Sequence, residues 1–445
     1  MVARSVDRSS DGQVVRPERR PTVTDSPRIT LPHRDFDLAC HCSVWGWGGA
    51  LTFARGLAAA LSRVGQQPLL LGIRPERPVA PLAEAADASD PPAADVPSGL
   101  PAGAWRLRHA RLPTSLARQL RRQPPPRRAV LALSPTWIRA AKAAWPDVPV
   151  IYIFPCLLAN CLPFTWHGRR APTWWTWLDY IAIFVLERGA LRRADLTLAP
   201  TQQSVEELRA FAPEAAARVE RCDFGGPDGA RPAGPAERAA ARRALGFPDD
   251  LFLVALVGKC DLNKAFDRAI RVLPRTAPRI HLVIVGDGPE LPALQALAAR
   301  TRVAPRVRFA GPQRDPSPFY AAADAVLSTS SYDTFPNVLL EGLAAGRPLV
   351  VPRHAPPHVY AGFAEVIAAE QCGVLYDARA PHALPDALNA LAASPAYAAE
   401  LGRRGRAAFE QRFTWDHAAR RIMGWCGLPD SGPAPCRATP AAATV

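Results

Sequence analysis

Residues 331–341 read SYDTFPNVLLE and follow an apolar run at 325–328. The run is as apolar as a strand that is buried on both faces, and Pro336 suits the first turn of a helix. Free backbone N–H groups and the helix dipole make such a helix start an anion site that needs no metal. Glu341 falls one helical turn beyond Asn337, where its carboxylate could accept both hydroxyl groups of a ribose. The stretch predicts a strand, a loop and a helix that face a phosphorylated ligand.

Two more turns follow apolar runs in the same half of the chain. The run at 252–257 is followed by GKCDLNK at 258–264, and the run at 281–285 by GDGPE at 286–290. Glycine lets the backbone approach a ligand, and two lysines five residues apart can bracket a diphosphate. A structural turn, or a capped helix with a solvent-facing glutamate, explains each piece singly. Their order along the chain favours one shared phosphate-binding edge.

The same alternation of apolar runs and amphipathic segments extends over the whole chain. It is typical of parallel sheets covered by helices, so we predict an α/β fold with two doubly wound sheets. The clearest helices lie at 50–64 and 178–193. Candidate strands lie at 36–42, 68–73, 129–133, 148–154, 195–199, 252–257, 281–285, 306–310, 325–328, 348–351 and 373–376. Ligands of such folds bind outside the carboxyl ends of the strands.

The 445 residues exceed what one hydrophobic core usually supports, which favours two domains. We expect a first domain at 35–226 and a second at 249–428, joined by a Pro- and Gly-containing linker at 227–248. A composition dominated by Pro, Ala, Asp and Ser predicts a long surface loop at 75–104. The predicted disordered tails are residues 1–34 and 429–445.

Composition restricts the partners and the compartment. The net charge is +14, and residues 101–150 hold ten basic groups and one acidic group. Such a patch attracts phosphates, but a solvated face explains charge alone better, and no nucleic-acid recognition motif supports a nucleic-acid partner. Nine cysteines without a disulfide or zinc spacing indicate reduced thiols. Residues 1–34 lack the apolar core of a signal peptide, so we predict a cytoplasmic protein.

The apolar stretch at 174–186 leaves two interpretations open. It is about 13 residues long, which is too short to span a membrane, since a spanning helix needs roughly 20 apolar residues. Trp174, Trp175, Trp177 and Tyr180 would suit a helix on the inner face of a membrane, where the arginines of 101–128 would meet anionic lipids. The alternative, which we favour, buries the tryptophans in the core and leaves the arginines in solvent.

The motifs of residues 250–425 resemble those of the retaining glycosyltransferases of family 4, which have the GT-B fold. That family reads Gly-Arg-x(4)-Lys-Gly, then Gly-x-Gly-Pro, then Glu-Gly-Phe-Pro-x(4)-Glu followed by Ala-x-Ala-x-Gly. The matching text here is GKCDLNKA at 258–265, GDGP at 286–289, DTFPNVLLE at 333–341 and GLAAG at 342–346. The first half matches more loosely, at Gly48-Gly49 before a helix and at Gly226-Pro227-Asp228 before the linker.

Three departures from the family affect the site. Lys259 replaces an arginine, which keeps the charge but loses the bidentate fork. Asp333 and Thr334 replace a glutamate and a glycine. Residues 154–156 read Phe-Pro-Cys where the family often has a histidine. His41 and His167 are weaker candidates for its place, because a lone histidine is more often structural.

The resemblance implies specific roles for the matched residues. Lys259, Lys264, the backbone at Gly49 and the helix start near Asn337 would stabilise the charge on a leaving diphosphate. Asp333 would hold sugar hydroxyls and Glu341 the ribose. Backbone near Phe309 and Gly311 would meet the base. The other donor-binding candidates are Gly258, Gly286, Phe335 and Pro336. No metal and no cofactor is expected besides the nucleotide sugar.

The resemblance also implies two Rossmann-like domains that face each other across a cleft, and an activity. A hexosyltransferase-type enzyme (EC 2.4) would move a sugar from a UDP- or GDP-linked donor to an acceptor hydroxyl with retention. The acceptor would be a small molecule or a lipid-linked glycan of bacterial glycan or natural-product biosynthesis. A non-catalytic nucleotide-sugar-binding partner subunit and a sugar-nucleotide epimerase of the same fold stay open as alternatives.

Overall fold

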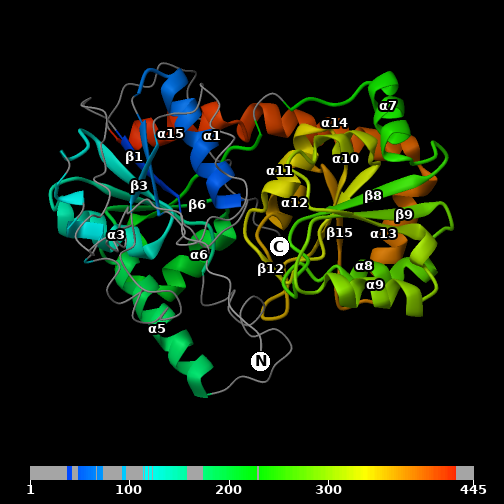
Figure 1. Cartoon of the computed structure of the whole chain (residues 1–445), viewed down its shortest axis with the longest axis horizontal. Coiled ribbons are helices and arrows are strands. Elements are labelled where there is room, and N and C mark those ends of the chain that lie inside the picture. Colours follow the sequence, from blue (N-terminus) through cyan, green and yellow to red (C-terminus); the bar gives the residue numbers. More distant parts are fainter. Residues whose placement is uncertain are drawn as a thin grey trace, which may run out of the picture.

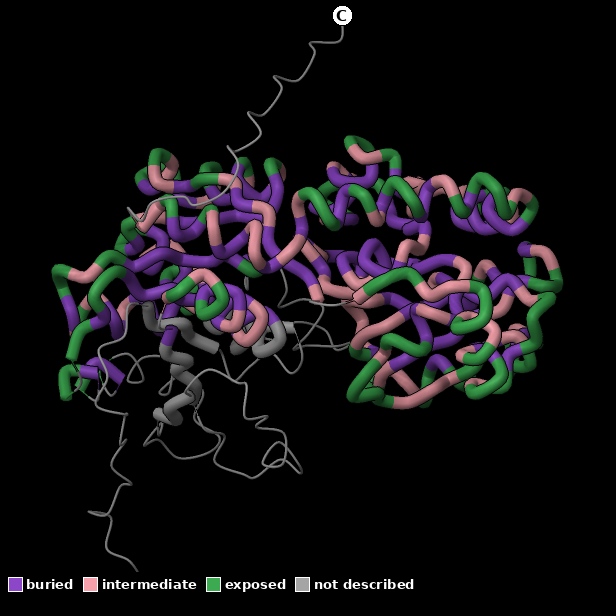
Figure 2. The backbone as a smooth tube through the Cα atoms, turned by 90° about the horizontal axis from the view of Figure 1, so that it is seen from above, coloured by how far each residue is buried: buried purple, intermediate pink, exposed green. Residues whose placement is uncertain are grey.

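The computed structural model describes residues 38–42, 49–66, 68–73, 93–96, 114, 116–118, 120–122, 124–157, 174–227 and 230–426. They form two parallel sheets, one from each half of the chain, that lie side by side (Figure 1). Buried segments run through both halves, so each sheet has a core of its own (Figure 2). The predicted α/β fold with two doubly wound sheets is confirmed. Both predicted tails lie outside the described residues.

The first sheet has seven parallel strands in the order β3-β2-β1-β4-β5-β6-β7. The order reverses between β1 and β4, which is the switch point of a doubly wound sheet. The strands are β1 (Leu38–Cys42), β2 (Pro68–Ile73), β3 (Ala93–Val96), β4 (Ala129–Ala132), β5 (Val150–Ile153), β6 (Leu196–Ala199) and β7 (Val219–Arg221). The sequence predicts a surface loop where β3 lies and no strand at β7. Both are edge strands that carry charged residues, so neither shows the apolar run of a central strand.

Helices cover both faces of the first sheet, and neighbouring strand residues point to opposite faces. On one face, Leu131 packs with Leu57 and Leu61 of α1; on the other, Val130 packs with Trp137 of α3. The helices are α1 (Gly49–Arg63), α3 (Pro135–Ala144), α5 (Trp174–Leu191) and α6 (Gln202–Phe211), with a 3-10 turn at η1 (Pro213–Arg218).

The second sheet has six parallel strands in the order β10-β9-β8-β11-β13-β15, and its order reverses between β8 and β11. The strands are β8 (Phe252–Val257), β9 (Ile280–Val285), β10 (Val307–Gly311), β11 (Ala325–Leu327), β13 (Leu349–Pro352) and β15 (Gly373–Tyr376), with a separate pair β12 (Tyr332–Asp333) and β14 (Tyr360–Ala361). Its helices are α8 (Asp267–Val272), α9 (Leu291–Arg300), α10 (Ser317–Ala322), α11 (Asn337–Ala344), α12 (Ala364–Glu370), α13 (Ala383–Ala393) and α14 (Pro395–Arg412), with 3-10 turns at η2 (Leu273–Arg275) and η3 (Ala304–Arg306). The six predicted strands of this half are present, each within one residue of its predicted ends.

Two helices do not follow the predicted domain limits. Helix α7 (Pro235–Leu245) occupies most of the predicted linker and packs on the second half. Its Arg242 is 1% exposed and donates to Asp324 Oδ2 at 2.5 Å. Helix α15 (Trp415–Trp425), predicted within the second domain, returns to the first half and lies against α1 (Figure 1). Trp415 contacts Phe53 of α1 edge to face, with ring centroids 4.9 Å apart.

Candidate active site

Three turns at the carboxyl edge of the second sheet pack backbone against backbone. Gly258 and Gly286, which follow β8 and β9, have φ values of +142° and +144°. A Cβ atom on Gly286 would lie 1.9 Å from the carbonyl oxygen of Gly258, so no larger residue fits. The N–H of Gly258 donates to Val285 O at 2.9 Å, and the N–H of Gly286 donates to Gly311 O at 2.8 Å. The turns therefore hold one another at the edge where the predicted site residues begin.

Lys264 and Asp333 form an ion pair at the switch point of the second sheet. Lys264 lies in the loop after β8, and Asp333 ends the short strand β12, which follows β11 in the chain. Strands β8 and β11 are neighbours where the order of the sheet reverses. Lys264 Nζ lies 2.6 Å from Asp333 Oδ2, and each side chain is 21% exposed. The N–H of Lys264 donates to Asp261 Oδ1 at 3.0 Å, which closes the turn behind the lysine. The structure thus brings together two predicted site residues that are 69 positions apart.

Lys259, the second predicted phosphate-binding lysine, is exposed. Its ammonium group has no hydrogen bond or ion pair within the described part of the chain. The next residue, Cys260, is buried, and burial raises the pKa of its thiol to about 11. At neutral pH this thiol is therefore uncharged and gives no thiolate nucleophile.

Two residues that the sequence did not single out hold the loops of the site together. The Asn263 amide group donates to Tyr332 O at 2.9 Å and accepts from Tyr332 N at 3.0 Å. Arg268 donates to Thr329 O at 3.1 Å and to the hydroxyl of Ser331 at 3.0 Å. No local pattern marks these side chains, because their partners lie more than sixty residues away.

Helix α11 begins at Asn337, directly after Pro336 at the N-cap. Proline has no polar side-chain atom, so the N-cap residue itself makes no capping hydrogen bond. The predicted helix start is thus in place, four residues beyond Asp333. The ring of Phe335, a predicted donor-binding residue, packs with Phe363, Phe413 and Phe224 at centroid distances of 5.0, 5.8 and 6.1 Å. This aromatic cluster anchors the loop between the two halves.

Glu341 lies one turn into α11 and is half-buried. It is therefore not the solvent-facing glutamate that a purely structural, capped helix would carry. Its Oε2 atom accepts a hydrogen bond from the hydroxyl of Tyr320 at 2.5 Å. Burial raises the pKa of Glu341, the hydrogen bond from Tyr320 lowers it, and the nearby charge of Asp315 raises it. The net direction is upward. Phe309 and Gly311, predicted to approach the base, lie near the end of β10, where Gly311 has a φ of +69°.

Only some of the site residues predicted in the first half belong to the described part of the chain. Gly49 begins α1, and Gly48 and His167 lie outside the described residues. His41 is in β1, and its side chain is also outside them. The segment after β5, where the family often has a histidine and this chain has none, meets the loop of the second half. Thr334 donates to Pro155 O, and Leu157 N donates to the Tyr332 hydroxyl at 3.1 Å.

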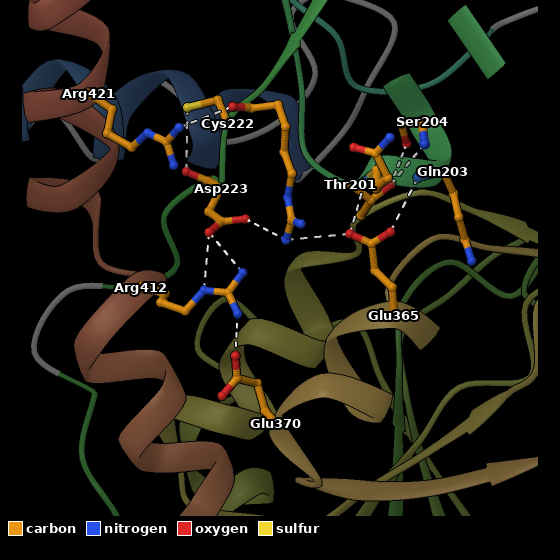
Figure 3. Close-up of polar contacts among 11 residues, drawn as sticks. Thr201, Gln203, Ser204, Cys222, Asp223, Glu365, Glu370, Arg412 and Arg421 are labelled. Atoms are coloured by element: carbon orange, nitrogen blue, oxygen red, sulfur yellow. Dashed lines mark hydrogen bonds and ion pairs between the residues drawn. The ribbon is translucent and has the colours of Figure 1, made fainter. Parts of the chain in front are cut away.

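A polar network joins the two halves beside this contact (Figure 3). Arg412 of α14 donates to Asp223 Oδ2 at 3.1 and 2.9 Å and also pairs with Glu370. The carboxylate of Glu365 accepts from the N–H groups of Gln202 and Gln203, at 2.9 and 3.2 Å, at the start of α6. This places an anion from the second half on a helix N-terminus of the first half, where the dipole favours it. The network fixes how the two carboxyl edges lie relative to each other.

Nowhere in the described ranges do three or more His, Cys, Asp or Glu side chains gather as metal ligands would. Within the same ranges no helix has the length and apolar character needed to cross a bilayer.

The second half of the chain is similar to known proteins in sequence. Residues 237–408 match the model of the family described as "Glycosyl transferases group 1". The D-inositol 3-phosphate glycosyltransferase of Xylanimonas cellulosilytica is 32% identical over 198 residues, which are 43% of this chain and 46% of that protein. The lipopolysaccharide core biosynthesis glycosyltransferase LpsE of Rhizobium meliloti is 39% identical over 119 residues, 27% of this chain and 35% of that protein. The chain thus spans between a third and a half of the length of these curated relatives.

Solved structures match over more of the chain and at lower identity. The Anabaena protein HepE, in complex with UDP and glucose, has a TM-score of 0.70 and 18% identity, and the match covers 88% of this chain and 99% of that one. Sucrose-phosphate synthase from Thermosynechococcus elongatus has a TM-score of 0.71 and 18% identity, with 87% and 98% covered. At this identity the likeness concerns the fold. Residues 237–408 therefore match the glycosyl transferases group 1, and the chain as a whole has the two-domain GT-B fold.

Proposed function

We propose that the protein is a retaining glycosyltransferase that moves a hexosyl-type sugar from a nucleoside diphosphate to an acceptor hydroxyl. The observation that carries the proposal is the Lys264–Asp333 pair at the switch point of a domain that matches the glycosyl transferases group 1. In doubly wound sheets, ligands bind at this point. A cation beside a carboxylate there suits a substrate with a diphosphate on one side and sugar hydroxyls on the other.

The proposed donor site uses groups from both halves. Lys264, Lys259 and the N-terminus of α11 contact the diphosphate, together with the backbone at Gly49. Asp333 accepts hydrogen bonds from sugar hydroxyls, and the edge of β10 meets the base. Two structural neighbours support a nucleotide sugar as the donor, since HepE was solved with UDP and glucose and with UDP-glucose. UDP and GDP are the two nucleotides to test first.

The proposed reaction breaks the bond between the sugar C1 and the diphosphate oxygen and forms a bond from C1 to the acceptor oxygen on the same face. The products are a glycoside, a nucleoside diphosphate and the proton of the acceptor hydroxyl. Negative charge grows on the leaving diphosphate, and the fixed cations and helix dipole of the second half stabilise it. Since these groups supply positive charge, the proposed mechanism routes no step through a metal.

A panel of nucleotide sugars tests the proposal. The donor that binds should raise the melting temperature of the protein, because a ligand that binds the folded state stabilises it by mass action. Release of nucleoside diphosphate from that donor then separates an enzyme from a non-catalytic binding subunit. Anomer analysis of the glycoside tests retention. A protein that no donor stabilises, and that releases no nucleoside diphosphate, contradicts the proposal.

We further propose that the acceptor is a soluble small molecule, and vesicle binding tests the lipid-linked alternative, for which the first half has exposed apolar and basic side chains. Ile181 and Val185 of α5, one turn apart, are 55% and 64% exposed. The arginines of the basic segment that the structure describes, Arg118, Arg121, Arg122, Arg127 and Arg128, are exposed as well. Sedimentation with vesicles of phosphatidylserine and phosphatidylcholine should pellet the protein at low salt if the acceptor is lipid-linked. Failure to pellet at low salt contradicts membrane contact and leaves a soluble acceptor.

A further inference from the structure

Tyr320 lies on α10, and its hydroxyl meets the carboxylate of Glu341 on α11. The Oη atom donates to Glu341 Oε2 at 2.5 Å, and the Tyr320 side chain is 3% exposed. Hydrogen bonds to an ionised acceptor are about twice as strong as neutral ones. We propose that Tyr320 is a positioning residue, which through this bond sets the orientation in which Glu341 accepts the ribose hydroxyls of the donor. The inference rests on the proposed function.

The carboxylate has room for both partners. Its two oxygens offer about four lone-pair sites, and Tyr320 uses one of them, on Oε2. No second hydrogen bond reaches this carboxylate from any residue that the structure describes. A ribose presents two neighbouring hydroxyl groups that need acceptors. A glutamate fixed before the nucleotide arrives loses less side-chain freedom on binding, so it binds the pair of hydroxyls more tightly.

Tyr320 is itself held in place by the core and by α11. It belongs to the same buried hydrophobic cluster as Leu340 and Leu343, which lie on either side of Glu341 in the sequence. Arg347, shortly after α11, donates to Tyr320 O and to Ala321 O, each at 3.0 Å. The two helices are therefore joined by the phenol–carboxylate bond and by the guanidinium–carbonyl bonds. Because Tyr320 is buried and its backbone is held by Arg347, the phenol is the more fixed partner of the half-buried carboxylate.

The ionisation states at this contact favour a hydrogen bond that Tyr320 donates and Glu341 accepts. Burial raises the pKa of Tyr320 well above its usual value, so the phenol keeps its proton and donates. The hydrogen bond from Tyr320 lowers the pKa of Glu341, against burial and the charge of Asp315, which raise it. Tyr320 thus favours the ionised carboxylate, which is the form that accepts from both ribose hydroxyls.

The test compares a ribonucleotide with its 2′,3′-dideoxy analogue by titration calorimetry. UDP and GDP are measured first with the unaltered protein, and the one that binds is paired with its dideoxy form. We expect the ribonucleotide to bind at least about tenfold more tightly, the effect of hydrogen bonds to a charged group. Tyr320→Phe keeps the ring and removes the hydroxyl. It should weaken the ribonucleotide by about fivefold or more and leave the dideoxynucleotide within about twofold.

Two further variants separate positioning from packing. Tyr376→Phe is the matched control, since Tyr376 is also 3% exposed and its hydroxyl donates to Ser328 O at 3.1 Å rather than to Glu341. It should leave the ribose preference unchanged. In the Glu341→Gln background, Tyr320→Phe should have no further effect on the preference. If Tyr320→Phe does not fold, Glu341→Asp replaces it, because the shorter carboxylate withdraws from the phenol.

Three outcomes overturn the inference, and they differ from one another. If Tyr320→Phe keeps the full ribose preference, or weakens both nucleotides equally, Tyr320 does not act through Glu341. If the unaltered protein binds a nucleotide without a ribose preference, the role of Glu341 fails while nucleotide binding stands. If it binds neither UDP nor GDP, the proposed function fails and this inference fails with it.

Discussion

Replacing Lys264 by alanine removes one member of the ion pair at the proposed donor site. The pair is short, at 2.6 Å, but both side chains are 21% exposed, so solvent screens their attraction. Pairs of this kind contribute about 0.2–1 kcal/mol to stability. For a protein of this size, that lowers the melting temperature by at most about 2–4 °C. We therefore expect Lys264→Ala to fold.

The same substitution should affect the rate far more than the stability. A fixed cation that faces a leaving diphosphate in a desolvated site contributes about 2–4 kcal/mol to the transition state. Since about 1.36 kcal/mol corresponds to a factor of ten, the rate should fall by about two orders of magnitude. The prediction is therefore a small loss of stability together with a large loss of rate.

The assay is the initial rate of nucleoside diphosphate release, with thermal unfolding measured alongside. Lys142→Ala is the matched control, because Lys142 Nζ lies 2.6 Å from Asp195 Oδ2 and its side chain is also 21% exposed. That pair lies in the first half, outside the proposed donor site. The control should show a similar small change in melting temperature and a nearly unchanged rate. Near-normal turnover in Lys264→Ala, or an equal loss in the control, would refute the reasoning.

Three further predictions follow from the same site. Ala265 is 7% exposed and has a φ of +48°, which glycine adopts more easily, so Ala265→Gly should raise the free energy of unfolding in urea by up to about 1 kcal/mol. Ala269→Gly, in α8, should lower it, and a change of the same sign in both variants would contradict the argument. Excess EDTA should leave transfer intact, and a rate that collapsed and returned with manganese would contradict a metal-free donor site. Since burial raises the pKa of Glu341, beside Tyr320 and Asp315, the preference for the ribonucleotide over its dideoxy form should fall as the pH drops through that raised value. Calorimetry with both nucleotides from about pH 8 to about pH 5 measures this, since the ionisation of the diphosphate is common to the two, and Glu341→Gln should abolish the dependence of the preference.

The sequence predicts the second sheet better than the first for a physical reason. Its strands are buried on both faces, so each is a short apolar run that stands out from the amphipathic helices around it. The edge strands β3 and β7 lack such runs because they are short and carry charge. The return of α15 to the first half has no local sign, since an apolar helix face reads the same whichever sheet it covers.

Some residues of the site could be predicted from the sequence, and others could not. Lys264 and Asp333 could be predicted because each lies in the segment that follows a strand of the sheet, and parallel strands end at one edge. Their supports, Asn263 and Arg268, could not, because their hydrogen bonds join loops that are far apart in the sequence. Phe335 was assigned to the donor from its motif, and its place among three aromatic rings depends on packing between the halves.

The pairing of α15 with α1 constrains the order in which the protein can be completed during synthesis. Arg63 of α1 and Asp416 of α15, which pair at 2.6 Å, are 353 residues apart. At about 5–20 residues per second, a ribosome needs roughly 20–70 seconds to make the intervening chain. Until then Phe53 of α1 lacks Trp415, the α15 side chain that packs against it. The first half, although made first, is therefore the last to acquire its full core.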